Sequence, residues 1–229
     1  DILDLGAEST RPGAPRVPEE QERERMSAAV AAIRRELPHM PLSIDTTRAS
    51  VAEAALENGA DIVNDVSGLQ CDNGSAEAAA RHRAMLVLMH MRGTPETMRT
   101  MCGYDNLISE VCAFREEASD KAVSLGVSRE SIIIDPGIGF AKDHWQNLFL
   151  LRHCESFKAL GYPLLIGASR KGCVGAATGR EAPEERLYGT LAVTALCCRQ
   201  GADIIRVHDV RENKDVIKMT EAIQGAEYA

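Results

Sequence analysis

The sequence predicts an α/β fold, a TIM (β/α)8 barrel, and two observations carry that prediction. Seven times along the 229 residues, a short apolar run ends at a polar residue. Between these runs lie stretches whose apolar residues recur at helical spacing. Strands that alternate with helices build a parallel sheet covered on both faces, or a closed barrel. In such a barrel the active site lies at the carboxyl ends of the strands, where these polar residues accumulate.

The predicted strands are short. In chain order they cover residues 1–5, 42–44, 62–63, 85–89, 132–134, 164–166 and 204–205. The helix after the first strand opens with acidic residues following Pro18, which suits the positive end of a helix. Thr46 or Thr47 is predicted to cap the next helix, which ends at Asn58-Gly59. Further helices are predicted over 107–125, 146–160, 186–199 and 213–222, with a loop over 172–185.

Residues 1–229 are predicted to form a single domain, because no repeat or linker interrupts them. Seven of eight βα units are visible, and the first strand begins at Asp1 without a preceding cap. A gap in a barrel would leave two strand edges unpaired, which folded proteins avoid. We therefore expect a first strand and helix to be missing from this sequence.

Composition excludes some classes of function. Twenty-six basic and 34 acidic residues give a net charge of −8, which argues against nucleic-acid binding. No apolar run reaches the length of a membrane span, so no membrane association is expected. The seven cysteines contain no C-x-x-C pair, which predicts reduced thiols and a cytoplasmic location.

Three strand ends carry groups suited to a polar heterocycle. A carboxylate at Asp45 or Asp135 can face a guanidine-like edge, and the amide of Asn64 both donates and accepts, as a pterin or purine requires. Any one of these residues could instead cap a helix or close a turn. Asp45 and Asp135 also allow Mg²⁺ bound with phosphate oxygens, whereas no His/Cys spacing supports zinc.

The last two strand ends carry cations. Alternation along a strand places Arg206 and His208 on one side, where they suit a phosphate or diphosphate, although a salt bridge with Asp209 is an alternative. Lys171 follows the sixth strand and could be a Schiff-base nucleophile, a proton donor or a point charge. Phe140 offers an aromatic face for stacking, and no P-loop pattern is present.

Seven segments, one at each strand end, resemble the dihydropteroate synthase family in family order. They are DLGAESTRPG at 4–13, SIDT at 43–46, NDVSG at 64–68, MHMRGTP at 89–95, DPGIGF at 135–140, SRK at 169–171 and RVHDV at 206–210. The resemblance implies a TIM-barrel transferase of folate biosynthesis, a sulfonamide target. It would join 6-hydroxymethyl-7,8-dihydropterin diphosphate to p-aminobenzoate, giving 7,8-dihydropteroate and diphosphate.

The resemblance also assigns residues to roles. It implies a pterin site of Asp45, Asn64, Asp135 and Lys171, a diphosphate site of Arg206 and His208 with Mg²⁺, a p-aminobenzoate pocket of Thr10, Arg11, Pro12, Phe140, Ser169 and Lys171, and catalytic roles for Lys171, Asp45 and Arg206. The family's main metal ligand is an Asn on the strand expected before residue 1, so Asp45 is only a weak metal ligand. The arylamine is itself a nucleophile, so the reaction needs stabilisation of the leaving group rather than an activated Ser or Cys.

Two other functions remain open on the sequence. A pterin-binding methyltransferase would share the acidic pocket, although the Ser-Thr-Arg-Pro-Gly loop and the 169–171 segment are not expected there. A non-catalytic module of a larger folate protein would explain the missing first unit. The apolar helix predicted over 186–199 exposes more apolar surface than a one-sided helix needs, which predicts a homodimer.

Overall fold

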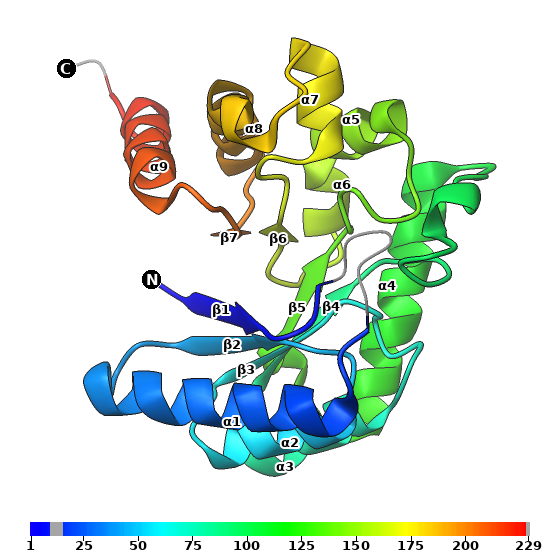
Figure 1. The fold of residues 1–229 in the computed structure, drawn as a ribbon. Helices are drawn as coiled ribbons and strands as arrows, with labels where there is room; N and C mark the ends of the chain where they lie inside the picture. The colour runs from blue at the N-terminus through cyan, green and yellow to red at the C-terminus, as the bar shows by residue number, and fades with distance from the viewer. Residues whose placement is uncertain (10–15, 228–229) are drawn as a thin grey trace. The chain divides into compact units, whose positions relative to one another are not determined.

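The computed structural model describes residues 1–9 and 16–227. The chain divides into two compact units. Unit 1 is Asp1–Glu96 with Ala113–Ile134, and unit 2 is Thr97–Cys112 with Asp135–Ala229. Strands and helices alternate along both units, as Figure 1 shows. The alternation predicted from the sequence is confirmed, while the prediction of a single domain stays a prediction.

A parallel sheet organises unit 1. Its strands lie in chain order and are β1 (Leu3–Gly6), β2 (Leu42–Asp45), β3 (Ile62–Asp65), β4 (Met85–Met89) and β5 (Ile132–Asp135). The pairs β1–β2, β2–β3 and β3–β4 are parallel. Every residue of β3 and β5 is buried, which is typical of parallel strands covered on both faces.

Three helices of unit 1 lie side by side along this sheet (Figure 1). They are α1 (Glu19–Glu36), α2 (Ala49–Glu57) and α3 (Gly74–His82). Met26 and Val30 of α1 pack against Leu42 and Ile44 of β2, and together they form part of one apolar core cluster. The sequence did not predict α3, because its buried face consists only of small side chains, Ser75, Ala76, Ala78 and Ala79.

The helix α4 (Leu107–Ser124) matches the range predicted from periodicity, and the division between the units falls within it. Short 3₁₀ turns η1 (Met98–Thr100), η2 (Arg129–Ser131) and η3 (Pro183–Arg186) occur in the connections. Within the described ranges 1–9 and 16–227, no helix combines the length and the apolar character that crossing a membrane requires.

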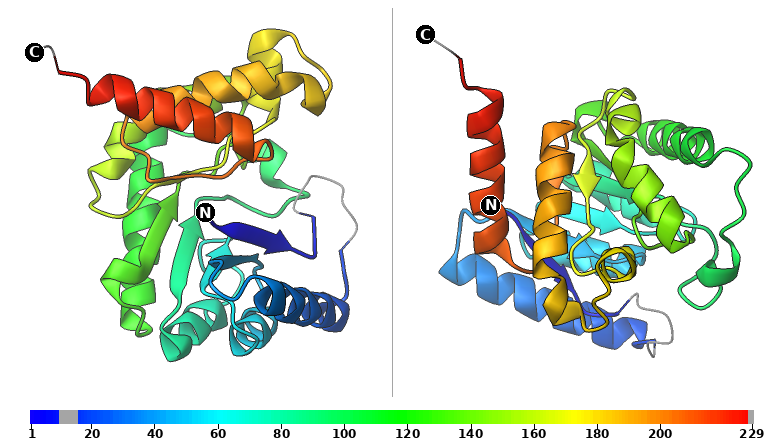
Figure 2. Two further views of the ribbon diagram at one scale, coloured as in Figure 1. Left: turned by 90° about the vertical axis from the view of Figure 1, so that its left-hand side faces the viewer. Right: turned by 90° about the horizontal axis from the view of Figure 1, so that it is seen from above.

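Unit 2 pairs two very short parallel strands, β6 (Leu165–Ile166) and β7 (Ile204–Ile205). Its helices are α5 (His144–Arg152), α6 (Cys154–Lys158), α7 (Gly172–Thr178), α8 (Leu187–Arg199) and α9 (Val210–Gln224). The helices α8 and α9 lie side by side (Figure 2). The last helix is longer than the predicted range 213–222.

One helix prediction and one loop prediction in unit 2 were wrong. The helix expected over 146–160 starts earlier, after a capping box between Asp143 and Gln146, and is interrupted at His153. The loop expected over 172–185 contains α7. Within this helix Gly175 is required by packing, because a Cβ there would lie 2.6 Å from the carbonyl oxygen of Arg180.

Candidate active site

The ends of β2 and β3 bring two predicted site residues together in unit 1. Asp45 and Asn64 are register partners in the parallel sheet, and Gly6 of β1 is the partner of Asp45 on its other side. A Cβ on Gly6 would lie 3.5 Å from the Asp45 Cβ, so this glycine leaves room beside the carboxylate. Asn64 is buried, and its Nδ2 lies 3.4 Å from the Asp4 Oδ1.

A buried carboxylate holds the loop that follows Asp45. Glu22 of α1 is only 2% exposed and accepts a hydrogen bond from the Thr46 hydroxyl at 2.8 Å. Its other oxygen accepts from Arg48, which also forms an ion pair with Glu8 at 2.8 Å. The N-cap residue of α2 is Arg48, without a side-chain cap, so the predicted threonine cap was wrong. Thr46 accepts instead from the Arg48 backbone N–H at 3.2 Å.

The loops after β1 to β4 surround a cavity of about 300 Å³ in unit 1. Glu8, Ser9, Arg16, Arg48 and Thr94 are among the residues that line it. This volume reaches the lower limit of small-molecule pockets. The predicted p-aminobenzoate residues Thr10, Arg11 and Pro12 lie outside the described residues, so their assignment stays a prediction.

Asp65 shapes the loop after β3, and the sequence analysis missed it. Its Oδ1 accepts from the Ser67 N–H at 2.8 Å and the Ser67 hydroxyl at 2.7 Å. Its Oδ2 accepts from the Leu69 N–H at 3.2 Å and the Ser75 hydroxyl at 2.9 Å. Burial raises the pKa of Asp65, while these hydrogen bonds act in the opposite direction. The carboxylate therefore fixes the loop that begins beside Asn64.

In unit 2, Gly167 lies close to two predicted site residues, Asp135 and Arg206. A Cβ on Gly167 would be 4.0 Å from the Asp135 Oδ2 and 3.9 Å from the Arg206 Cβ. The Asp135 Oδ1 accepts from the Gly137 N–H at 2.7 Å, which closes the turn after β5. The structure thus places the carboxylate and the arginine near the same small residue.

Lys171 lies along the loop that follows Asp135. Its Nζ donates to the carbonyl oxygen of Ile138 and is 4.6 Å from the centroid of the Phe140 ring, a cation–π arrangement. A Cβ on Gly139 would lie 3.0 Å from the Lys171 Cδ, so the lysine stem needs a glycine beneath it. The structure therefore brings Lys171 and Phe140 together.

Two further residues hold this loop and were not predicted. The Nζ of Lys142, which is 7% exposed, donates to the carbonyl oxygens of Gly137 at 3.1 Å and Phe140 at 2.8 Å. The Asn147 Oδ1 accepts from the Gly139 N–H at 2.6 Å. Nothing in the sequence distinguishes Lys142 from a surface lysine, because its acceptors are backbone atoms.

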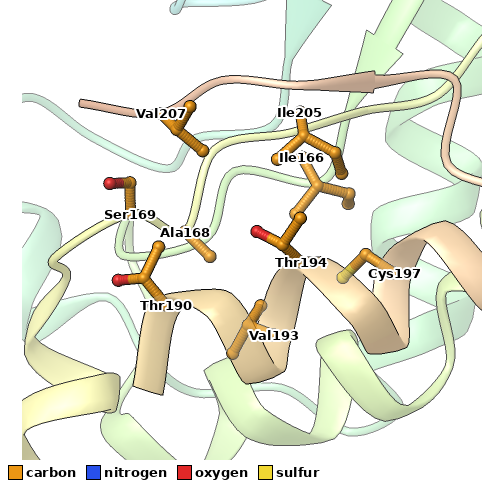
Figure 3. Close-up of a pocket in the computed structure, with 9 residues that line it drawn as sticks. All are labelled: Ile166, Ala168, Ser169, Thr190, Val193, Thr194, Cys197, Ile205 and Val207. Carbon is orange, nitrogen blue, oxygen red and sulfur yellow. The ribbon is translucent and has the colours of Figure 1, made fainter. Parts of the chain in front are cut away.

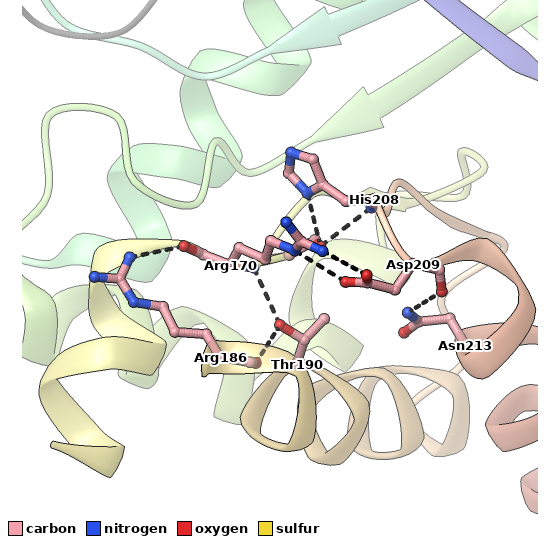
Figure 4. Close-up of polar contacts among 7 residues, drawn as sticks. Arg170, Arg186, Thr190, His208, Asp209 and Asn213 are labelled. Atoms are coloured by element: carbon pink, nitrogen blue, oxygen red, sulfur yellow. Dashed lines mark hydrogen bonds and ion pairs between the residues drawn. The ribbon is translucent and has the colours of Figure 1, made fainter. Parts of the chain in front are cut away.

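Ser169 and His208 are in direct contact. The serine Oγ lies 2.9 Å from the His208 Nδ1 and accepts from the His208 N–H at 3.2 Å. Arg206 and His208 are both exposed. The alternative partner considered for them, Asp209, instead binds the guanidinium of Arg170 at 3.0 and 2.5 Å, as Figure 4 shows. This hydrogen bonding lowers the pKa of Asp209.

A small cavity adjoins these residues in unit 2. It lies among β6, β7 and α8, and Ser169, Thr190 and Val207 are among its lining residues (Figure 3). Its volume is about 10 Å³, near the minimum that a single water needs. The cavity is a packing gap rather than a substrate site.

The described part of the chain contains no group of three or more His, Cys, Asp or Glu residues that could hold a metal ion. Asp45 remains as a carboxylate at a strand end. Mg²⁺ commonly takes one or two carboxylates together with substrate phosphate oxygens and water. The donor set therefore fits Mg²⁺ only as an ion carried in with a phosphorylated ligand.

Comparison with known proteins identifies the class. The pterin binding enzyme family matches residues 1–208. A dihydropteroate synthase of Synechocystis sp. is 47% identical over 97% of this chain and 76% of its own length.

Similar solved structures are also dihydropteroate synthases. A Yersinia pestis dihydropteroate synthase with a sulfonamide drug complex has a TM-score of 0.94 and 36% identity, covering 98% of this chain and 81% of that one. A dihydropteroate synthase from Thermus thermophilus in complex with 4-aminobenzoate has a TM-score of 0.89 and 41% identity, covering 97% and 84%.

The family match and the similar solved structures define a pterin-binding enzyme of the TIM-barrel class, as predicted. Within that class, the chain belongs to the dihydropteroate synthase family.

The Glu22 network gives a test of how the loop after β2 is held. Glu22→Gln should lower the free energy of unfolding by about 1.5–3 kcal/mol, because buried charged hydrogen bonds to Thr46 and Arg48 are weakened. Glu20→Gln is the matched control: it alters an exposed ion pair with Arg23 on the same helix and should cost about 0.5 kcal/mol or less. Urea unfolding measures both, and equal losses would show that Glu22 holds nothing essential.

Proposed function

We propose that the chain condenses 6-hydroxymethyl-7,8-dihydropterin diphosphate with p-aminobenzoate, giving 7,8-dihydropteroate and diphosphate in folate biosynthesis. The observation that carries this proposal is the 47% identity to a dihydropteroate synthase over 97% of the chain. The retained strand-end residues support it. A methyltransferase or a non-catalytic module receives no comparable support.

Four residues would hold the pterin ring. In unit 1, Asp45 and Asn64 are register partners that offer a carboxylate beside an amide. In unit 2, Asp135 and Lys171 offer a second carboxylate and an ammonium group. Carboxylates suit the guanidine-like edge of a pterin, and an amide or ammonium donor suits its carbonyl.

The diphosphate would lie against Arg206 and His208. Both are exposed after β7, and Ser169 contacts the His208 ring at Nδ1. If the Ser169 hydroxyl donates to Nδ1, the neutral ring carries its proton on Nε2, which can then donate to a phosphate oxygen. A cationic guanidinium and an N–H donor stabilise the negative charge that grows as the leaving group departs.

The p-aminobenzoate pocket would be formed by Thr10, Arg11, Pro12, Phe140, Ser169 and Lys171. The arylamine nitrogen attacks the pterin methylene carbon, and the carbon–oxygen bond to the diphosphate breaks. The electron pair leaves with the diphosphate, and the nitrogen loses a proton. No nucleophilic side chain is required, so the site acts by positioning and by charge stabilisation, with Lys171, Asp45 and Arg206 as catalytic groups.

Mg²⁺ is the proposed metal, with Asp45 as a weak protein ligand. When bound, it would neutralise part of the charge on the diphosphate. The cytoplasm is the proposed location. That location is supported by the cysteines, none of which is in a disulfide in the structure.

A homodimer is also proposed. Exposed apolar side chains lie on two adjacent helices of unit 2: Tyr188 and Leu196 on α8, and Met219 and Ile223 on α9. Side chains of this kind favour burial against another chain. Light scattering on the purified chain should give twice the chain mass, and a monomer at every accessible concentration would contradict the proposal.

Titration calorimetry tests the proposed function. The chain should bind the pterin diphosphate more tightly with Mg²⁺ than without it, and should also bind p-aminobenzoate. Arg206→Ala should weaken the pterin diphosphate about tenfold or more, because a charged hydrogen bond to phosphate is worth roughly 1.5–3 kcal/mol. Binding of free 6-hydroxymethyl-7,8-dihydropterin should hardly change. Equal losses for both ligands would overturn the assignment of Arg206.

A further inference from the structure

Arg170 has an unusual backbone conformation between two proposed site residues, Ser169 and Lys171. Its φ is +58°, in the left-handed region that non-glycine residues rarely adopt. Two side chains hydrogen-bond to the Arg170 backbone and hold this conformation (Figure 4). The Arg170 N–H donates to the Thr190 Oγ1 at 3.1 Å, and its carbonyl oxygen accepts from Arg186 at 2.8 Å.

The side chain of Arg170 reaches the next loop rather than a ligand. Its Nε and Nη2 donate to both oxygens of Asp209, the residue that follows His208. The two side chains are 27% and 18% exposed, so the pair is partly shielded from solvent. A guanidinium that meets a carboxylate through two parallel bonds fixes orientation as well as distance.

Asp209 is itself fixed from the other side. Its carbonyl oxygen accepts from the Asn213 Nδ2 at 2.7 Å, and the Asn213 Oδ1 accepts from the Thr194 hydroxyl at 2.6 Å. Asn213 and Thr194 are both buried. The loop after β7 is therefore held from two directions. Thr194 of α8 holds it by way of Asn213 of α9, and Arg170 holds it from the loop after β6.

We infer that Arg170 and Asp209 are positioning residues that keep the loop of Ser169 and Lys171 in fixed register with the loop of Arg206 and His208. This inference rests on the proposed function, in which Lys171 contacts the pterin ring and His208 contacts the diphosphate. Neither Arg170 nor Asp209 has to touch the substrate.

The register of the two loops should matter most for a ligand that spans both of them. A pterin diphosphate contacts both loops at once, so its affinity depends on their spacing. Free 6-hydroxymethyl-7,8-dihydropterin needs only the ring contacts, and inorganic diphosphate needs only the contacts after β7. Loss of the register should therefore weaken the joined ligand and spare its two parts.

The chain offers a matched control at the other end of the same two strands. Lys158 forms an ion pair with Asp203 at 2.5 Å, just before β7, and the same carboxylate oxygen accepts from the Leu164 N–H, just before β6, at 2.7 Å. This ion pair joins α6 to the residue before β7, at the amino ends of the strands, and the Asp203–Leu164 hydrogen bond does not depend on the lysine. Lys158→Met should therefore leave the binding of all three ligands unchanged.

The experiment measures dissociation constants for the three ligands in the presence of Mg²⁺. Arg170→Met should weaken the pterin diphosphate about tenfold to a hundredfold, since small misplacements in a site have effects of this size. The same variant should change the affinity for free 6-hydroxymethyl-7,8-dihydropterin, or for inorganic diphosphate, less than about twofold. Arg170→Lys keeps the positive charge but loses the paired donors of the guanidinium. Its affinity for the pterin diphosphate should lie between those of the wild type and Arg170→Met. If Arg170→Met fails to fold, Asp209→Asn should show the same selective loss.

Three outcomes would overturn the inference. Equal losses for all three ligands would mean that Arg170 only supports the folded site. An unchanged affinity for the pterin diphosphate would mean that the register is set elsewhere. The same selective loss in Lys158→Met would mean that the link is not specific. A wild-type chain that does not bind the pterin diphosphate would instead refute the proposed function.

Discussion

Cationic side chains that bind main-chain carbonyl oxygens hold the loops of both units. The strands are two to five residues long, so much of the backbone that carries the site lies outside the sheet ladders. Arg34 donates to the carbonyl oxygen of Gly59, Lys142 to that of Gly137, and Arg186 to that of Arg170. A buried carbonyl without a donor would cost roughly 1–3 kcal/mol, so these contacts make irregular loops compatible with a packed interior.

The cationic side chains near the site fall into two groups. Some bind other groups of the protein and hold its loops, and others are proposed to bind the ligand. Lys142 is buried against two carbonyl oxygens, and Arg170 is paired with Asp209. Arg206 and His208 are exposed at the end of β7, where a ligand can reach them. Lys171 combines both properties, because it donates to Ile138 while its ammonium group faces the Phe140 ring. The side chains of Lys142 and Arg170 thus hold the backbone of the loops that carry the proposed ligand-binding residues.

Local patterns in the sequence predicted the strands and the site residues that follow them. An apolar run that stops at a polar residue locates Asp45, Asn64 and Asp135 without any knowledge of distant contacts. The sequence pattern indicated neither α7, where Gly175 reflects close packing, nor α3, whose small side chains gave no visible apolar face. The spacing of apolar residues therefore could not predict either helix.

The supporting groups could not be predicted, because their partners are distant in sequence. Glu22 meets Thr46 across 24 positions, and Arg170 meets Asp209 across 39. Asp65 is closer to its partners, but a carboxylate that accepts from loop N–H groups resembles any turn residue in sequence. The sequence also offered Asp209 as a partner for Arg206 or His208, and only the structure shows that it binds Arg170.

The central claim is that this chain catalyses a condensation rather than only binding pterins. Its most direct test incubates the purified chain with 6-hydroxymethyl-7,8-dihydropterin diphosphate, p-aminobenzoate and Mg²⁺, and measures both products by chromatography. The account predicts 7,8-dihydropteroate and diphosphate in equal amounts, with neither formed when p-aminobenzoate is omitted. Diphosphate release without an arylamine adduct, or no product from a folded chain that binds both substrates, would contradict it.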